Sequence, residues 1–512
     1  MADPIVDTAA GTLRGTSERN GILVFRGIPY GAPTGGERRF LPPQPAEPWA
    51  GVRDATQFGP ICPQGGAVAS QSLADQKTIG YLPPLLQSED CLVLNVWTPA
   101  ADNGKRPVMV WLHGRGYAAG AGSEEWYNGA DLARRGDVVV ITVNHRLNAF
   151  GYLHLADLDS RFAGSGVAGL LDVVLALQWV RDNIAGFGGA PGNVTIFGES
   201  GGGAKVSTLL AMPSAEGLFH RAIVQSGPGL QGVEPGAATD FAERLIAHLG
   251  LKTSELDRLQ QLPFQRITEA LETLPAGEGE GPARGAAMRL APVVDGTFLP
   301  QHAFDPVAAP TAANVPLIIG TNKDEAALFM AGDPRRRRLE EHELLERLTR
   351  MLGDRRDEIL EVYRRNRPEA TPWELLIGIS SEGTRLRSIQ LAERKAAGGP
   401  APVYMYLFTW ESDYLGNLFK SAHAMEIPFV FDHPDAAPFT GSKPDRQELA
   451  AIMSRAWAAF ARNGDPNYDG LPYWPAYTPE TRATMIFDVP PRVENDPRRE
   501  ERLVWGGLVA RR

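Results

Sequence analysis

The segment NVTIFGESGGGAKV, at residues 193–206, decides the fold. An apolar, β-branched run leads into a glycine cluster and then into helix-forming residues, which predicts a strand, a sharp turn and a helix. The GESGG sequence at 198–202 matches G-x-S-x-G, the motif that holds a nucleophilic serine on a strained turn. Gly198 and Gly202 leave the space that such a turn needs. No Gly-Lys-Ser/Thr follows, so the cluster is not a phosphate-binding loop.

Short apolar runs recur on both sides of this segment. Continuous apolar runs without alternation are typical of strands buried on both faces of a parallel sheet. Such runs lie at 108–112, 138–143, 194–197, 222–224, 317–319 and 403–408. Helical periodicity at 170–184 and 205–211 falls between them. The alternation predicts an α/β protein with a large, mostly parallel central sheet.

The N-terminal edge of the predicted sheet and two long stretches between its strands differ from this alternating pattern. Runs at 12–16, 23–28 and 92–98 predict an antiparallel edge near the N-terminus. Residues 239–290 and 335–396 are helix-rich with charged faces, which indicates helical insertions over the active site. No internal repeat is present. We therefore expect residues 1–512 to form a single domain with two helix-rich insertions.

Composition excludes several classes of protein. Of 512 residues, 43% are hydrophobic and 22% are charged, which is ordinary for a globular protein. The pI near 5.5 argues against nucleic-acid binding. No run approaches about 18 consecutive apolar residues, which predicts no membrane span. The first residues lack the features of a signal peptide, so we expect a cytoplasmic protein. Two cysteines and no metal-ligand spacing predict no metal site, and the serine chemistry predicted here implies no other cofactor.

A second glycine-containing loop, WLHGRGY at 111–117, directly follows the predicted strand 108–112. Acyl transfer requires backbone N–H groups aimed at the oxygen that becomes negative. A loop of this kind can bring its backbone close to a substrate. We expect Arg115 and Gly116 to donate from this loop, together with Gly201, the residue after the nucleophile.

A serine nucleophile of this type is followed along the chain by an acid and then by a histidine. His423 lies in an irregular region after the predicted strand 403–408, which suits a general base, whereas His433 lies in a turn before proline. Asp324 and Glu325 follow the predicted strand 317–319. The order of residues alone leaves Asp295, Asp324 and Glu325 open as the acid.

Five segments spread over nearly the whole chain resemble the type B carboxylesterase and cholinesterase family of α/β-hydrolases. They are FRGIPY at 25–30, SEDCLVLNV at 88–96, the stretch 179–202 that leads into the serine motif, NKDE at 322–325 and AHAMEIPF at 422–429. The resemblance implies an α/β-hydrolase fold and selects Glu325 as the acid of a Ser200–Glu325–His423 triad. It also implies a bacterial serine carboxylesterase that forms an acyl-enzyme with a small-molecule ester.

Two other functions are compatible with this family. An amidase or carbamate hydrolase would use the same triad. A catalytically silent adhesion protein would not need one, so the intact Ser200, Glu325 and His423 argue against that alternative. Nothing in the sequence indicates the acyl or alcohol preference or the oligomeric state.

The chain departs from the family at several positions. Gly201 stands where the family usually has alanine, and Arg115 replaces the middle residue of three glycines. The Arg115 side chain either pairs with a nearby carboxylate or carbonyl, or reaches the pocket and favours anionic substrates. Cys62 and Cys91 match the family's first disulfide pair, whereas a reducing cytoplasm would leave two thiols.

Large apolar residues next to the motifs are candidates for the wall of the substrate pocket. Each of them alone is also compatible with ordinary core packing. The candidates are Tyr117, Phe329, Met330, Met425 and Phe431.

Overall fold

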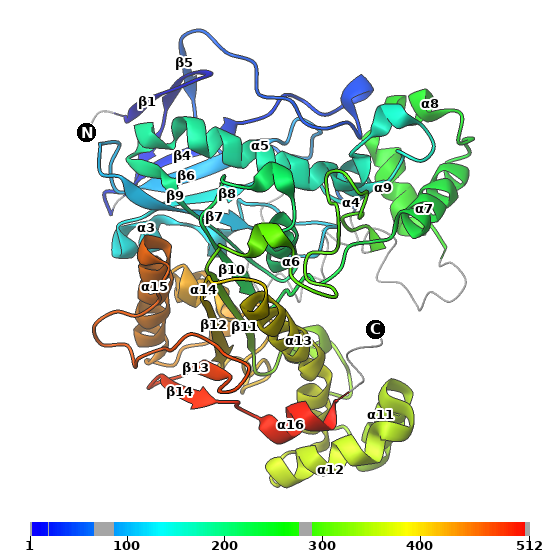
Figure 1. Cartoon of the computed structure of the whole chain (residues 1–512), viewed down its shortest axis with the longest axis vertical. Helices are drawn as coiled ribbons and strands as arrows, with labels where there is room; N and C mark the ends of the chain where they lie inside the picture. The colour runs from blue at the N-terminus through cyan, green and yellow to red at the C-terminus, as the bar shows by residue number, and fades with distance from the viewer. Residues whose placement is uncertain (1–2, 19, 66–85, 276–288, 507–512) are drawn as a thin grey trace.

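A sheet of eleven strands forms the centre of the protein in the computed structural model, which describes residues 3–18, 20–65, 86–275 and 289–506 (Figure 1). In spatial order the strands are β14 (Arg492–Asn495), β13 (Ala483–Phe487), β12 (Val403–Phe408), β11 (Leu317–Asn322), β10 (Arg221–Gln225), β9 (Gly189–Glu199), β7 (Arg106–Leu112), β8 (Val139–Val143), β6 (Val93–Thr98), β4 (Leu23–Pro29) and β3 (Thr16–Ser17). All neighbours from β13 to β8 are parallel. The predicted mostly parallel sheet is therefore confirmed.

Antiparallel strands close the sheet at both edges. β3, β4 and β6 form the predicted N-terminal edge. The predicted strand 12–16 is wrong in its placement, because β2 (Gly11–Arg14) pairs with β1 (Ile5–Thr8) and β5 (Val52–Asp54) in a separate small sheet. The antiparallel β14 at the other edge was not predicted. Its residues are largely exposed, so it carries no apolar run.

Two hydrophobic cores lie on opposite faces of the sheet. β7 shows the division, because Val108 and Val110 belong to one core while Met109 and Trp111 belong to the other. Strands buried on both faces explain the continuous apolar runs in the sequence. The helices that contribute are α3 (Ala130–Gly136), α4 (Asn148–Tyr152), α5 (Ala168–Asn183), α6 (Gly201–Leu209), α7 (Pro235–His248), α8 (Leu256–Gln261), α9 (Phe264–Thr273), α10 (Ala326–Met330), α11 (Glu341–Leu352), α12 (Arg356–Asn366), α13 (Pro372–Ala397), α14 (Ile427–Val430), α15 (Arg446–Asn463) and α16 (Arg499–Val504).

The two stretches predicted to be helix-rich do contain helices. α7, α8 and α9 lie together beside α4 and α5, and α11 and α12 lie at the lower end of the view with α16 (Figure 1). Within the first stretch, residues 276–288 are outside the described residues. The amphipathic α11 packs Leu344 and Leu348 against the second core, so its charged face is left to solvent.

One helical stretch is apolar enough to cross a membrane by length and composition. It is Ser160–Phe187, which includes α5, and 89% of its most apolar window is buried inside the protein. No other such helix occurs in the part of the chain that the structure describes. A helix that is apolar all round is also what the core of a large protein contains.

A buried ion pair anchors the loop after β8. The guanidinium of Arg146 donates to both oxygens of Asp172 on α5, at 2.8 and 2.6 Å, and the Arg146 N–H also donates to Asp172. Both side chains are fully buried. Removing one partner of such a pair leaves an uncompensated buried charge, which costs about 3–5 kcal/mol.

The two cysteines meet beside this loop. Both are free, buried thiols, and the Cys62 sulfur accepts the Leu147 N–H at 3.2 Å. A hydrogen bond with Cys62, together with burial, raises the pKa of the Cys91 thiol well above its usual range. The disulfide that the family resemblance implies is therefore not formed, and the raised pKa opposes thiolate chemistry at Cys91.

We expect the purified protein to release two titratable thiols on unfolding, and its melting temperature to be the same with and without a reductant. A bridge between these residues would close a loop of about 28 residues, worth roughly 3 kcal/mol in the chain-entropy model. A reductant-dependent drop in melting temperature, with no thiol titrating before reduction, would contradict the assignment.

Candidate active site

Ser200 occupies the turn between β9 and α6 in a backbone conformation that few residues adopt. Its φ is 55° and its ψ is −120°, and its N–H donates to the Gln225 carbonyl of β10 at 2.8 Å. Strain of this kind costs about 1–3 kcal/mol and persists only where the surroundings enforce it. Ser200 is also the N-cap residue of α6, so the positive end of the helix dipole lies beneath it.

The glycines of the motif are required by close packing. A methyl group on Gly198 would lie 2.6 Å from the Leu112 carbonyl oxygen at the end of β7, and one on Gly202 would overlap that oxygen. Gly202 therefore marks a place where the backbones of α6 and β7 meet without room for a side chain. This contact brings the loop after β7 to Ser200.

The predicted oxyanion loop lies directly beside Ser200. A methyl group on Gly114 would lie 3.5 Å from the Ser200 Cβ and 3.0 Å from the Glu199 Oε2. Arg115 and Gly116 both have a φ of 63°, so the loop passes through two successive left-handed residues. Arginine adopts this region at a cost of about 1–2 kcal/mol, which the surrounding contacts must offset.

The Arg115 side chain turns toward a carboxylate. Its Nε lies 3.3 Å from Oε1 of Glu124, and its Nη2 donates to Oε2 of the same residue at 3.4 Å. Glu124 is buried and also accepts the Trp126 indole N–H at 2.8 Å. Burial lowers the pKa of Arg115, but Glu124 more than offsets this and raises it. The guanidinium thus completes a buried ion pair.

The predicted acid and base meet at the carboxyl ends of β11 and β12. His423 Nδ1 lies 2.5 Å from Glu325 Oε2, and the other carboxylate oxygen accepts the Asn322 N–H at 2.8 Å. One oxygen thus holds the acid to its own strand, and the second points at the imidazole. His423 Nε2 faces the residue before the nucleophile, 3.1 Å from Glu199 Oε1.

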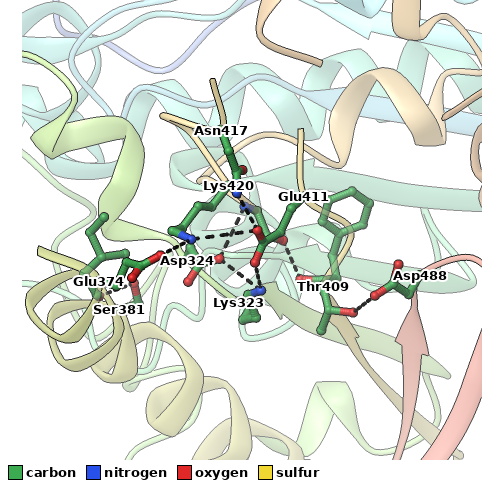
Figure 2. A network of polar contacts seen from close by, with 12 residues as sticks. Lys323, Asp324, Glu374, Ser381, Thr409, Glu411, Asn417, Lys420 and Asp488 are labelled. Carbon is green, nitrogen blue, oxygen red and sulfur yellow. Dashed lines mark hydrogen bonds and ion pairs between the residues drawn. The ribbon is translucent and has the colours of Figure 1, made fainter. Parts of the chain in front are cut away.

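A polar network joins the loop of the acid to the loop of the base (Figure 2). The Asp324 N–H donates to the Ser421 carbonyl at 3.0 Å, and the Asn322 amide donates to the Ala422 carbonyl at 2.6 Å. Farther along, Lys323 pairs with Glu411, and Lys420 pairs with Glu374 at 2.8 Å. These contacts fix two loops that are almost one hundred residues apart in the sequence.

The other acid and base candidates have different partners. Oδ1 of Asp295 accepts three backbone N–H groups, from residues 297–299, as a turn-stabilising carboxylate does. Asp324 is engaged by Ser421 and Lys323. His433 lies 3.2 Å from Asp131 on α3. Of the three carboxylates left open by the sequence, Glu325 is the one that contacts His423.

The protonation of His423 is coupled to the carboxyl groups around it. Burial alone lowers the pKa of His423, but Glu199 and Glu325 more than offset this and raise it above its usual value. Burial raises the pKa of Glu199 well above its usual range, although His423 opposes this. Burial also raises the pKa of Glu426. Interacting groups of this kind titrate as a unit, and the imidazole takes up its proton at higher pH than a solvated histidine.

The predicted pocket residues separate into two groups. Phe329 is 54% exposed, and its ring lies 4.9 Å from that of His423. Met330 and Tyr117 are half-buried, and Tyr117 packs on Tyr152. Met425 and Phe431 are fully buried in the second core, with Phe431 against Trp111 and Phe197. For these two the prediction is wrong, because a side chain without accessible surface offers none to a substrate.

Sequence reasoning missed two residues at this site. The motif G-x-S-x-G leaves the position of Glu199 variable, although a carboxylate next to the predicted nucleophile is a detectable signal. Helical periodicity alone gives Lys205 no special role. It is fully buried on α6, and burial lowers its pKa to about 7. A lysine in an otherwise apolar stretch beside a glycine cluster could have drawn attention to it.

A strained serine between a central strand and a helix, with a histidine–carboxylate pair at the ends of the next strands, defines an α/β-hydrolase. Comparison with known proteins agrees. Residues 2–505 match the carboxylesterase family. Para-nitrobenzyl esterase of Bacillus subtilis is 37% identical over 98% of both chains. Phenmedipham hydrolase of Pseudarthrobacter oxydans is 33% identical over 94% of both. The crystal structure of a Geobacillus stearothermophilus carboxylesterase has a TM-score of 0.82 at 41% identity, over 98% of this chain and 99% of that one.

The protein belongs to the carboxylesterase family, and it is a carboxylic ester hydrolase.

The coupled titration predicts an effect of Glu199 on the pH profile. A protonated imidazole cannot accept the serine proton, so kcat/KM falls as the pH drops through the His423 pKa. Glu199→Gln removes a carboxylate that raises this pKa, and we expect the acid limb of kcat/KM to move to lower pH. Glu374→Gln, which removes a carboxylate that contacts Lys420, is the control and should leave the limb in place. An acid limb that stays fixed or moves upward in Glu199→Gln would contradict the coupling.

The Arg115–Glu124 pair predicts no preference for anionic substrates. In Arg115→Gly, kcat/KM for an anionic ester and for its neutral analogue should change by the same factor. The melting temperature should fall, because leaving Glu124 buried and unpaired costs about 3–5 kcal/mol, more than the 1–2 kcal/mol of backbone strain that glycine relieves. Arg115→Gly combined with Glu124→Gln should recover part of this loss. A tenfold selective loss on the anionic ester would show that the guanidinium binds substrate.

Proposed function

We propose that Ser200, Glu325 and His423 carry out ester hydrolysis through an acyl-enzyme. The observation that carries the proposal is the orientation of His423. Its Nδ1 is held at 2.5 Å by Glu325, so its Nε2 faces the nucleophile turn. A carboxylate in this position selects the tautomer with a proton on Nδ1 and stabilises the imidazolium that forms during the reaction.

In the first half-reaction, His423 Nε2 accepts the Ser200 hydroxyl proton while the oxygen attacks the ester carbonyl. The tetrahedral intermediate carries its negative charge on the former carbonyl oxygen. We assign its stabilisation to the backbone N–H groups of Arg115, Gly116 and Gly201. The imidazolium then gives its proton to the departing alcohol, which leaves the acyl group on Ser200.

In the second half-reaction, His423 deprotonates a water molecule that attacks the acyl-enzyme. The same N–H groups hold the second oxyanion. Its collapse releases the carboxylic acid, and Ser200 regains its proton from the imidazolium. The two half-reactions together consume only the ester and one water molecule.

We infer that the substrate is a small-molecule ester with an uncharged acyl group. The Arg115–Glu124 pair leaves no unpaired cation on the loop to attract a negative group. The exposed ring of Phe329 beside His423 supports an apolar wall at this side of the site. The name of the Bacillus subtilis relative specifies a para-nitrobenzyl ester, and an ester of this kind is therefore the first substrate to test.

We also propose that the protein is a single catalytic domain and that it is located in the cytoplasm. The eleven-stranded sheet takes strands from β3 near the N-terminus to β14 near the C-terminus, which supports a single catalytic domain. The two free thiols support a cytoplasmic location, because an oxidising compartment favours disulfides. Fractionation of the producing cells tests the location, and activity in the exported fraction would contradict it.

Single substitutions test the assignment of the triad. Ser200→Ala should lower kcat on a nitrophenyl ester by a factor on the order of 10⁶, with little change in melting temperature. His423→Ala should be inactive while His433→Ala keeps wild-type activity. Glu325→Gln should lose more activity than Asp324→Asn or Asp295→Asn. More than a few per cent of wild-type kcat in Ser200→Ala would overturn the mechanism, and a reversed ranking among the other variants would move the base or the acid.

A further inference from the structure

Lys205 lies buried beneath the oxyanion loop, in a position that the proposed mechanism does not use. It belongs to the second turn of α6, the helix that begins after Ser200. Its side chain has no exposed surface. A buried amine needs hydrogen-bond acceptors, since burying it unpaired costs several kcal/mol.

The acceptors of Lys205 are two backbone carbonyls of one loop. Its Nζ donates to the His113 oxygen at 3.0 Å and to the Gly116 oxygen at 2.9 Å. These two carbonyls bracket Gly114 and Arg115. A single side chain from the nucleophile helix therefore holds both ends of the segment that carries the proposed donors.

The loop is strained where Lys205 holds it. Arg115 and Gly116 both have left-handed backbones, and an unrestrained arginine would leave this region. The ring of Tyr117, the next residue, lies with its centroid 5.3 Å from the Lys205 Nζ, which adds a cation–π contact. The hydrogen bonds and this contact together oppose relaxation of the loop.

Gly201 makes room for the carbonyl that Lys205 binds. A methyl group on Gly201 would overlap the Gly116 oxygen and would lie 2.5 Å from the Gly116 carbonyl carbon. The Gly116 carbonyl thus occupies the space that an alanine side chain would need at position 201. The glycine at 201 and the lysine at 205, one turn apart on α6, act on the same peptide group.

We propose that Lys205 is a positioning residue for the oxyanion hole, which draws the Gly116 carbonyl into the space left by Gly201 and so aims the Arg115 and Gly116 N–H groups. The inference rests on the proposed function, since it requires these N–H groups to serve the oxyanion. The hydrogen bond from Lys205 to the Gly116 carbonyl accounts for two departures from the family, Arg115 and Gly201.

The test compares Lys205→Met with Lys395→Met. Lys395 on α13 is equally buried and donates to the Ala313 carbonyl before β11, at the end of the sheet opposite the site. We expect Lys205→Met to lower kcat at least tenfold with KM changed less than about threefold, because the N–H groups act on the transition state. The affinity for a trifluoromethyl ketone, which forms a tetrahedral adduct, should fall by a similar factor. Lys395→Met should keep wild-type kcat.

Gly201→Ala is a second variant, and it tests the inference even if Lys205→Met does not fold. Its methyl group meets a carbonyl that Lys205 holds in place, so we expect at least a tenfold loss of kcat. In the Lys205→Met background the carbonyl can move away, and the same substitution should cost less. Wild-type kcat in Lys205→Met or in Gly201→Ala, or losses that multiply independently in the double variant, would overturn the inference. Because Ser200→Ala tests the mechanism separately, an inactive Ser200→Ala beside a fully active Lys205→Met would reject the inference and leave the proposed function intact.

Discussion

The close contact between the turn at Ser200 and the end of β7 is the constraint on which the rest of the site depends. Gly198 and Gly202 let the two backbones approach until no side chain fits between them. The approach holds Ser200 in its strained conformation and brings the loop after β7 next to it. A central strand pair buried on both faces is what makes such a contact rigid, since strain at the turn must be offset by packing around it.

The remaining parts of the site reach the turn because the strands are parallel. Their carboxyl ends share one edge, so the loops after β7, β9, β11 and β12 converge there. Convergence alone would not align an acid with a base. The alignment comes from the contacts of Asn322 and Asp324 with residues 421–422 and from the network around Glu411 and Lys420 (Figure 2). At the same edge of the sheet, the carboxylates of Glu199 and Glu325 raise the pKa of His423.

Features with a local signal could be predicted from the sequence. The strand–turn–helix at Ser200, the parallel strands other than β13 and the helix-rich stretches follow from periodicity and turn residues over short windows. The edge strand β14 lacks such a signal, because its exposed residues carry no apolar run. The antiparallel pairing of β2 with β1 depends on a chain reversal at residues 9–10 that the prediction did not use.

Contacts between distant segments could not be predicted in this way. Order along the chain left three carboxylates open for the acid, and family resemblance was needed to choose among them. Nothing local indicates that Lys205 bonds to the loop at 113–116, or that Glu124 receives the Arg115 side chain. Met425 and Phe431 adjoin a catalytic motif in sequence, yet the helical turn after His423 directs them into the core. A residue that lies next to a catalytic motif in the sequence therefore need not lie next to the substrate.

Covalent labelling can show whether Ser200 is the nucleophile. A fluorophosphonate reacts with an activated serine when the hydroxyl oxygen attacks phosphorus and displaces fluoride. Intact-mass measurement should show one adduct per chain with parallel loss of esterase activity, and peptide mapping should place the adduct on Ser200. Full loss of activity with the adduct on another residue, or an unlabelled Ser200 in fully inhibited protein, would contradict the account.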